Sequence, residues 1–443
     1  MISASGGIKS STASCFTMES WTWKGLLCFA SVVLMVNASD RTLNIALNPR
    51  CPLGPEECAH DGAPAPFSNN LLYVISYNPR PNTTDPRYKI YWSTIDAPTV
   101  LIAEIAPDTD ASDPGIAWPE FIQDNKPEVP FLVPNSKRYA GFALANLIEW
   151  DDVDNTGQLT NKSSTIIHPF AEAHWYNASV KTEGDGVFLA TFVGTFGRTP
   201  RDNNITIELR AHLDPSRAAL PPRMQIMPSS VTARIILNQT AVHFNHSRFA
   251  LDMIFASNDS SRRPAVHSID KSISDEFSPG IFTTEKISGA DTYLQWRPVV
   301  YTAANPGVSD STRSQTGSVR NATLSFNASL SDVPDSLLLG LAGITDPGNT
   351  LLRFNVSLGQ TDDGFYNSTA YQDWTCELGL GQAPVDQPTS KIKLIIGIGF
   401  GVPAALILVG VVYVVYLKIK RRRREREAGL LVTETTTNYQ TLG

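Results

Sequence analysis

Length, composition and charge narrow the classes of protein to which this chain can belong. It has 443 residues, with 36 Lys and Arg, 43 Asp and Glu and a formal net charge of -7 at pH 7. Between two apolar segments near the ends, residues 39–417 hold 27 basic and 39 acidic side chains, so this part is about 12 units negative. Such a charge argues against a nucleic-acid-binding protein, because affinity for phosphates comes largely from Lys and Arg.

The first apolar segment, residues 25–36, follows Lys24 and precedes small and apolar residues at the places that a signal peptidase reads. A run of about 12 apolar residues is too short to cross a hydrocarbon layer roughly 30 Å thick. We therefore predict a signal peptide over residues 1–38, with Ser39 as the first mature residue and Met18 as an alternative start.

The second apolar segment runs from Leu394 to Leu417 and contains 24 residues without a charge, which suits a membrane-spanning helix. The basic cluster that follows is typical of the cytosolic side of a membrane. A nuclear localisation signal is the competing interpretation, but the position of the cluster favours stop-transfer. The predicted organisation is a single-pass type I protein with a lumenal domain over residues 39–390, a transmembrane helix over 391–417 and a cytosolic tail over 418–443.

Within the second segment, Gly397, Gly401 and Ala405 repeat at a spacing of four residues. Small residues at this spacing form a smooth stripe against which another helix can pack closely. Glycine is common in membrane helices, so both a helix-packing stripe and ordinary composition remain open.

Five cysteines are present, and Cys15 and Cys28 fall within the predicted signal peptide. The mature chain keeps Cys51, Cys58 and Cys376, an odd number that excludes complete internal pairing. In an oxidising lumen we favour a disulfide between Cys51 and Cys58 over a pair with Cys376. The absence of any Cys-x-x-Cys pair in the sequence gives no support to a zinc cluster or a redox motif.

Sequons of the form Asn-x-Ser/Thr mark candidate N-glycosylation sites, which require surface positions. They all lie between the two apolar segments and none lies in the tail, which indicates a lumenal, glycosylated domain. The candidate sites are Asn82, Asn161, Asn177, Asn204, Asn238, Asn245, Asn258, Asn321, Asn327, Asn355 and Asn367.

Several sequons lie in segments that alternate strictly between apolar and polar residues. The segments are residues 204–213, 321–330 and 352–358. A period of two predicts strands with one buried face and one hydrated face, and the glycans would stand on the hydrated face. Further strand-like segments are Lys89–Trp92, Val187–Val193, Val231–Leu237 and Phe249–Phe255.

No lumenal stretch shows a long helical apolar period. The predicted fold class is therefore mainly β, an antiparallel sandwich-like lumenal domain of one or two subdomains, plus one transmembrane α-helix.

The sequence contains no Gly-x-Ser-x-Gly, His-Glu-x-x-His or Walker A motif. Asp151, Asp152 and Asp154 resemble the start of a calcium loop, but Ser163 stands where a bidentate Glu is required. We therefore predict no metal site and no cofactor.

Two histidine-containing segments are candidates for a metal site or a catalytic site. His243 and His246 flank the sequon at Asn245, so we expect them to be solvated rather than metal ligands. His267, Ser268 and Asp270 are adjacent in sequence, which a catalytic triad does not require. No catalytic residue is predicted.

The tail carries a sorting motif. Tyr439 and Leu442 fit Tyr-x-x-Φ, a tetrapeptide that binds clathrin adaptors in extended form with its two side chains in separate pockets. Tyr416 begins a second match at the membrane, where an adaptor cannot reach it. Leu430 and Leu431 form an imperfect dileucine signal, because Arg426 occupies its acidic position.

With these features the chain resembles the glycosylated lysosomal membrane protein family. The most specific part of the resemblance is Gln295, Trp296, Arg297 and Pro298, followed by Val299-Val300-Tyr301. The other shared segments are residues 91–93, 147–151, 267–270, 275–279 and 384–386, together with the single helix and the tail tyrosine. This chain departs from the family in an insertion between Asp270 and Asp275, a longer basic run and its cysteine positions, so no disulfide pairing can be carried over.

The resemblance implies a non-enzymatic accessory subunit of a lysosomal major-facilitator transporter of dipeptide type. Such a subunit would protect the transporter from lysosomal proteases and aid its lysosomal localisation. The implied partners are that transporter and, through the tail, a clathrin adaptor, with a homodimer left open. The alternative function is a lumenal hydrolase or carbohydrate-binding module anchored in the lysosomal membrane.

Overall fold

The computed structural model divides the chain into two compact units, residues 1–386 and 387–443. The residues described are 41–60, 71–78, 86–105, 115–116, 131–132, 136–160, 163–183, 186–197, 204–258, 264–272, 281–307, 309–322, 349–385 and 390–440. The predicted signal peptide and residues 323–330 of one predicted strand lie outside this set, as does Leu442.

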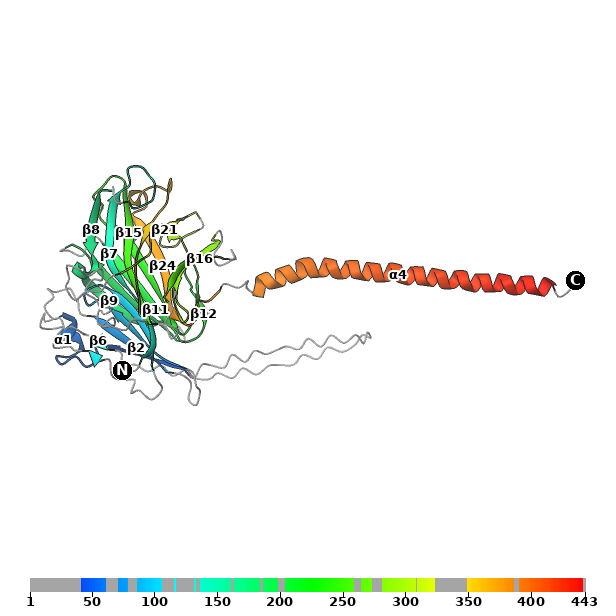
Figure 1. Ribbon diagram of the computed structural model, residues 1–443, viewed down its shortest axis with the longest axis horizontal. Coiled ribbons are helices and arrows are strands. Elements are labelled where there is room, and N and C mark those ends of the chain that lie inside the picture. Colours follow the sequence, from blue (N-terminus) through cyan, green and yellow to red (C-terminus); the bar gives the residue numbers. More distant parts are fainter. Residues whose placement is uncertain are drawn as a thin grey trace, which may run out of the picture. The chain divides into compact units, whose positions relative to one another are not determined.

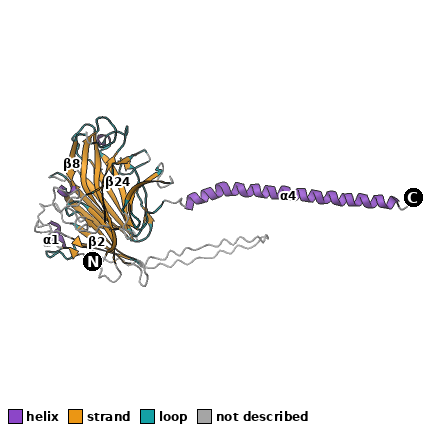
Figure 2. Cartoon of the chain, in the orientation of Figure 1, coloured by secondary structure: helices purple, strands orange, loops and turns teal. Residues whose placement is uncertain are grey.

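The first unit contains two ten-stranded sheets among its described residues (Figures 1 and 2). The first sheet has the order β1-β2-β3-β4-β7-β15-β23-β21, with β8 paired to β7 and β22 paired to β23. The second has the order β16-β17-β18-β24-β14-β11-β10-β9, with β19 paired to β24 and to β20. Every pairing between described strands is antiparallel, as the fold-class prediction required.

The bounds of the first sheet's strands are β1 Thr42–Leu47, β2 Leu72–Asn78, β3 Arg87–Ser93, β4 Thr99–Ile105, β7 Ser136–Asp151, β8 Thr165–Pro169, β15 Ser247–Asn258, β21 Ser314–Thr316, β22 Arg320–Asn321 and β23 Asn349–Leu358. Those of the second sheet are β9 His174–Glu183, β10 Val187–Thr195, β11 Ile205–His212, β14 Ser230–Asn238, β16 Val266–Lys271, β17 Thr283–Ser288, β18 Thr292–Trp296, β19 Val300–Tyr301, β20 Ser311–Thr312 and β24 Tyr371–Leu380. The remaining elements are the two-stranded sheets β5 Gly115–Ile116 with β6 Phe131–Leu132 and β12 Ser216–Arg217 with β13 Gln225–Ile226, the helices α1 Pro55–His60 and α4 Ser390–Gln440, and the 3-10 turns η1 Phe170–Glu172 and η2 Tyr366–Ser368.

The two sheets share one apolar core, which makes the unit a sandwich. Strand β11 shows why: its residues at alternate positions enter the core while Thr206, Glu208 and Arg210 between them stay partly exposed. Strand β23 of the opposite sheet alternates in the same way, with Arg353 and Asn355 partly exposed between buried apolar residues. The residues that meet between the sheets include Ile205, Ile207, Leu209 and Ala211 from β11 and Leu352, Phe354, Val356 and Leu358 from β23.

The outer faces of the central strands β4 and β15 are buried, unlike those of the alternating segments, for which a hydrated face was predicted. All seven residues of β4 are buried, and β15 is buried over most of its length. A second apolar cluster, which includes Leu72, Tyr91 and Ile254, covers the outer side of the first sheet and contains Cys58 from α1. The sequence did not predict this covering, because the pattern of one strand does not show what packs on its outer side.

The second unit is the helix α4. Its segment Ser390–Glu427 is long and apolar enough to cross a membrane, with a mean hydropathy of 2.5 in its most apolar window. The helix continues through the predicted tail to Gln440 and includes Pro403. The three residues of the predicted helix-packing stripe, Gly397, Gly401 and Ala405, are exposed. No atom lies within 4 Å of a Cβ placed on Gly397 or Gly401.

Candidate functional site

Eight of the predicted glycosylation sites fall within the described residues, and none of these eight is buried. Exposed sites are Asn177, Asn238, Asn245, Asn321 and Asn367, and partly exposed sites are Asn204, Asn258 and Asn355. The sites Asn82, Asn161 and Asn327 lie outside the described residues. All eight are therefore placed where an attached glycan meets solvent.

Several sequons gather at one end of the sandwich, although they are far apart in sequence. The side-chain amide of Asn367 donates a 3.2 Å hydrogen bond to the carbonyl oxygen of Asn245. The backbone N–H of Asn238 donates to the carbonyl oxygen of Asn204 at 3.3 Å. Gln239, next to Asn238, donates its N–H to the carbonyl oxygen of Ala370 at 2.8 Å, close to Asn367, so four predicted glycans would share this end of the sandwich.

The edge strand β16 and its neighbour β17 present a contrasting surface. No sequon occurs between Asn258 and Asn321. In this interval Val266, Ile269 and Phe282 are large apolar residues with about 60% exposure. Strand β16 is also the end of the described strand order of the second sheet. The surface formed by β16 and Phe282, named here the β16 edge, thus combines these exposed apolar side chains with the exposed charges of Asp270 and Lys271, and no sequon lies within it.

The segment that carries the family resemblance is buried. Trp296 has no exposed surface and stacks against the ring of Phe354, with centroids 5.6 Å apart and planes 8° apart. It also contacts Trp374, at a centroid distance of 6.0 Å. Arg297 donates to the hydroxyl of Ser272 and to the carbonyl oxygen of Thr283. These residues support the core near the β16 edge.

Histidine and serine on β16 do not form a triad. His267 stacks on Trp296 with planes 9° apart, and its Nε2 lies 3.4 Å from a carboxylate oxygen of Glu285. Asp270 instead pairs with Lys286 at 2.5 Å. Because adjacent strand residues point to opposite faces, Ser268 and His267 diverge.

The acidic loop that resembled a calcium loop is organised by an arginine. Both carboxylate oxygens of Asp152 are engaged: one accepts from the backbone N–H of Thr156, and the other from the backbone N–H of Gly157 and from Arg248 Nε. Arg248 is 1% exposed and also donates to Asp363 and Asn155. Burial alone would raise the pKa of Asp152, but these hydrogen bonds lower it. Asp152 therefore closes a loop and pairs with a cation.

The two histidines expected to be solvated, His243 and His246, keep 47% and 42% of their side-chain surface exposed, and each also lies beside a carboxylate. His243 Nδ1 lies 2.7 Å from Glu149 Oε2, and His246 Nδ1 lies 3.2 Å from Asp151 Oδ1. Nε2 of His168, from β8, lies 4.0 Å from the same oxygen of Glu149. The sequence analysis did not predict this group of three residues. One feature of the sequence indicated it: Glu149 has the same strand parity as the core residue Leu147, so a carboxylate was to be expected on the buried face.

Glu149 is ionised at this position. It has no exposed surface, and burial by itself would raise its pKa. Hydrogen bonds from His168, Ser247 and His243 outweigh burial and lower the pKa to about 2. A buried carboxylate held in its charged form, next to two imidazoles, can bind a cation.

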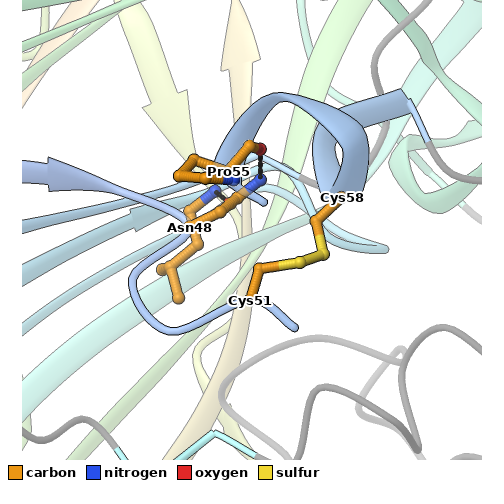
Figure 3. Close-up of a disulfide and its surroundings, with 5 residues drawn as sticks. Asn48, Cys51, Pro55 and Cys58 are labelled. Carbon is orange, nitrogen blue, oxygen red and sulfur yellow. Dashed lines mark hydrogen bonds between the residues drawn. A yellow bond between two sulfur atoms is a disulfide. The ribbon is translucent and has the colours of Figure 1, made fainter. Parts of the chain in front are cut away.

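The disulfide predicted between Cys51 and Cys58 is present (Figure 3), and Cys376 is a buried free cysteine on β24. Asn48 ties the loop to the sheet: its side chain donates to the carbonyl oxygen of Pro55 and accepts from the backbone N–H of Leu72. The disulfide therefore helps to fix α1 over the outer face of the first sheet.

The fold and these sites define a class: a lumenal antiparallel β-sandwich with surface sequons, carried on one membrane-spanning helix. A sequence model of the glycosylated lysosomal membrane protein family matches residues 74–423. Among named relatives, glycosylated lysosomal membrane protein B of Xenopus laevis is 25% identical over 314 residues, covering 67% of this chain and 74% of the relative. The Homo sapiens glycosylated lysosomal membrane protein is 23% identical over 390 residues, covering 83% and 84%.

The chain belongs to the glycosylated lysosomal membrane protein family, as its sequence resemblance implied. It is a single-pass type I protein of the lysosomal membrane with its β-domain in the lumen. Among solved structures, a match to Pichia pastoris lysyl oxidase covers 76% of this chain and 69% of the lysyl oxidase chain, at 10% sequence identity and a TM-score of 0.17. That likeness is too low to support an argument.

Proposed function

We propose that this protein is a non-enzymatic accessory subunit of a lysosomal major-facilitator transporter of dipeptide type. It would bind the transporter, protect it from lysosomal proteases and aid its delivery to lysosomes. The observation that carries the proposal is the contrast between the sequon-bearing surface and the β16 edge, where Val266, Ile269 and Phe282 are exposed.

The contrast has a physical rationale. Glycans on exposed strand positions obstruct proteases, whereas a protein partner needs a surface that glycans leave free. Exposed apolar side chains on an edge strand invite contact, because an edge also offers unpaired backbone groups. We therefore place the transporter contact on the β16 edge.

A glycan wedge tests this placement with one substitution. Asp270 is exposed on β16, and Asp270→Asn creates an Asn-x-Ser sequon with Lys271 and Ser272. A glycan added there would stand on the proposed contact. The matched control is Asp270→Gln, which also removes the charge and the pairing with Lys286 but creates no sequon.

We expect the wedge variant to gain one glycan, to lose the transporter on co-purification from lysosomes and to shorten the transporter's lifetime. Inhibitors of lysosomal proteases should restore transporter abundance, and the Asp270→Gln control should behave like the wild type. Normal transporter binding by a fully glycosylated wedge variant would exclude the β16 edge as the contact. If no transporter declines when the whole protein is removed, the accessory role itself is wrong.

A further inference from the structure

Three potential metal ligands from three segments meet at one end of the sandwich. Glu149 belongs to β7, His168 to β8, and His243 to the connection between β14 and β15. One ligand atom from each residue lies within 4.8 Å of the other two. Two imidazoles and one carboxylate are the donor set of many zinc sites with three protein ligands.

The distances suit a single ion after a small adjustment. Oε2 of Glu149 lies 2.7 Å from Nδ1 of His243 and 4.0 Å from Nε2 of His168. Two ligand atoms on one tetrahedral zinc lie roughly 3.4 Å apart, given bonds of about 2.1 Å. The shorter separation must therefore widen by about 0.7 Å and the longer one shrink by about 0.6 Å. The more exposed ring of His243 has the most freedom to move.

Hydrogen bonds to Oε1 of Glu149 orient its other oxygen, Oε2, for metal binding. Oε1 of Glu149 accepts from the hydroxyl of Ser247 at 2.5 Å and from the backbone N–H of His243 at 2.6 Å. These bonds leave Oε2 facing the two rings. Fixing one oxygen of a ligand carboxylate by hydrogen bonds is a common support in metal sites, because it orients the other oxygen.

The site also has an entrance. The side chain of Glu149 has no exposed surface and that of His168 is 17% exposed, whereas that of His243 is 47% exposed. Solvent therefore reaches the group on the His243 side, where a water molecule could complete four-coordination. The ring of His168 also packs near the ring of Phe196, with ring centroids 5.2 Å apart.

We propose that Glu149 Oε2, His168 Nε2 and His243 Nδ1 bind one divalent transition-metal ion, for which zinc fits the donors best. This inference does not depend on the accessory-subunit proposal. That proposal concerns the β16 edge, whereas the metal site lies beside the sequons at Asn245 and Asn367. A buried carboxylate that faces two imidazoles gains a compensating charge from the ion.

The test uses the full-length glycosylated protein in detergent, purified without a histidine tag and stripped with a chelator. Zinc is titrated at neutral pH, and binding is followed by calorimetry. Cobalt serves as a spectroscopic substitute, since its visible absorption reports four-coordination. We expect one zinc ion per chain and a four-coordinate cobalt spectrum.

Two ligand variants and one matched control locate the ion. His168→Asn and His243→Asn should each weaken zinc binding by more than about tenfold. His246→Asn removes a neighbouring carboxylate-paired imidazole that is not a ligand, so its zinc affinity should equal that of the wild type. Thermal unfolding of the metal-free proteins checks that each variant is folded, and Glu149→Gln replaces any histidine variant that is not.

Two results would overturn the site. One is the absence of saturable zinc binding by the wild-type protein. The other is an equal loss of zinc affinity in His246→Asn and in the ligand variants, which would mean that binding follows the general histidine content of this end.

Discussion

Nε2 of Gln295 lies 2.7 Å from Oε2 of Glu377, so a residue of the family motif donates to a carboxyl group that has no exposed surface. The two residues are register partners on the neighbouring strands β18 and β24. Oε1 of Glu377 accepts from Ser230 and Tyr293. Burial raises the pKa of Glu377 from 4.5 to about 7, because these hydrogen bonds oppose desolvation only in part.

The raised pKa predicts that the contribution of Glu377 to stability is larger in acid than at neutral pH. Between pH 4.5 and 7 the folded protein keeps a proton on Glu377 that the unfolded chain has lost, so the stabilisation present below pH 4.5 is lost as pH rises through 7. Glu377→Gln should remove this dependence, which amounts to roughly 3 kcal/mol over that range. Denaturation of wild type and variant at a series of pH values measures it, and two parallel pH profiles would contradict it.

The core position of Trp296 predicts a large loss of stability on truncation. Trp296→Ala leaves a cavity beside Phe354 and Trp374, and we expect a loss of about 3 to 5 kcal/mol in the free energy of unfolding. Phe282→Ala, an exposed aromatic residue on the β16 edge, should change it by less than about 0.5 kcal/mol. A normal melting temperature for Trp296→Ala, with loss of the transporter, would make Trp296 a contact residue instead.

Arg248 connects three segments at one end of the sandwich, through Asp152, Asn155 and Asp363. Arg248→Met would leave buried carboxylates without a cation, so we expect a loss of about 3 to 5 kcal/mol. Lys286→Met breaks a more exposed pair and should cost about 1 kcal/mol or less. Chemical denaturation compares the two, and equal effects would show that the buried arginine has no special role.

Sorting by the tail is predicted to require both pocket-binding side chains. Tyr439→Ala or Leu442→Ala should divert the protein to the plasma membrane, measured by surface biotinylation. Tyr439 lies at the end of α4, so the last turn must unwind before an adaptor can bind an extended tetrapeptide. Tyr416→Ala, in the membrane-adjacent match, is the control that should leave sorting unchanged. Lysosomal residence of both tail variants would assign sorting to the partner or to another signal.

A subunit that protects by contact should contain no indispensable nucleophile. Ser268→Ala and Asp154→Ala, neither of which creates a sequon, are therefore expected to leave the transporter's lifetime unchanged. The measurement is a chase of transporter abundance in cells that carry each variant. Loss of protection by a folded, transporter-bound variant would indicate catalysis and favour the lumenal hydrolase.

The sequence alone determined the features that depend on neighbouring residues. Alternation from Ile205 to Ala211 correctly predicted which side chains of β11 face the core, because a strand shows its two faces every second residue. The uncharged segment from Leu394 to Leu417 predicted the membrane-spanning helix for a similar reason, since length and hydropathy are local properties. The Cys51–Cys58 disulfide followed from their short separation.

Only the tertiary structure decided what the outer faces contact and which distant residues meet. His212 has outward parity on β11 but is 7% exposed, and burial next to Arg210 lowers its pKa to about 4. Glu149 and His243 are 94 residues apart in sequence and 2.7 Å apart in space. Strand pairing and packing between layers bring such residues together, and neither is encoded in the periodicity of a single segment.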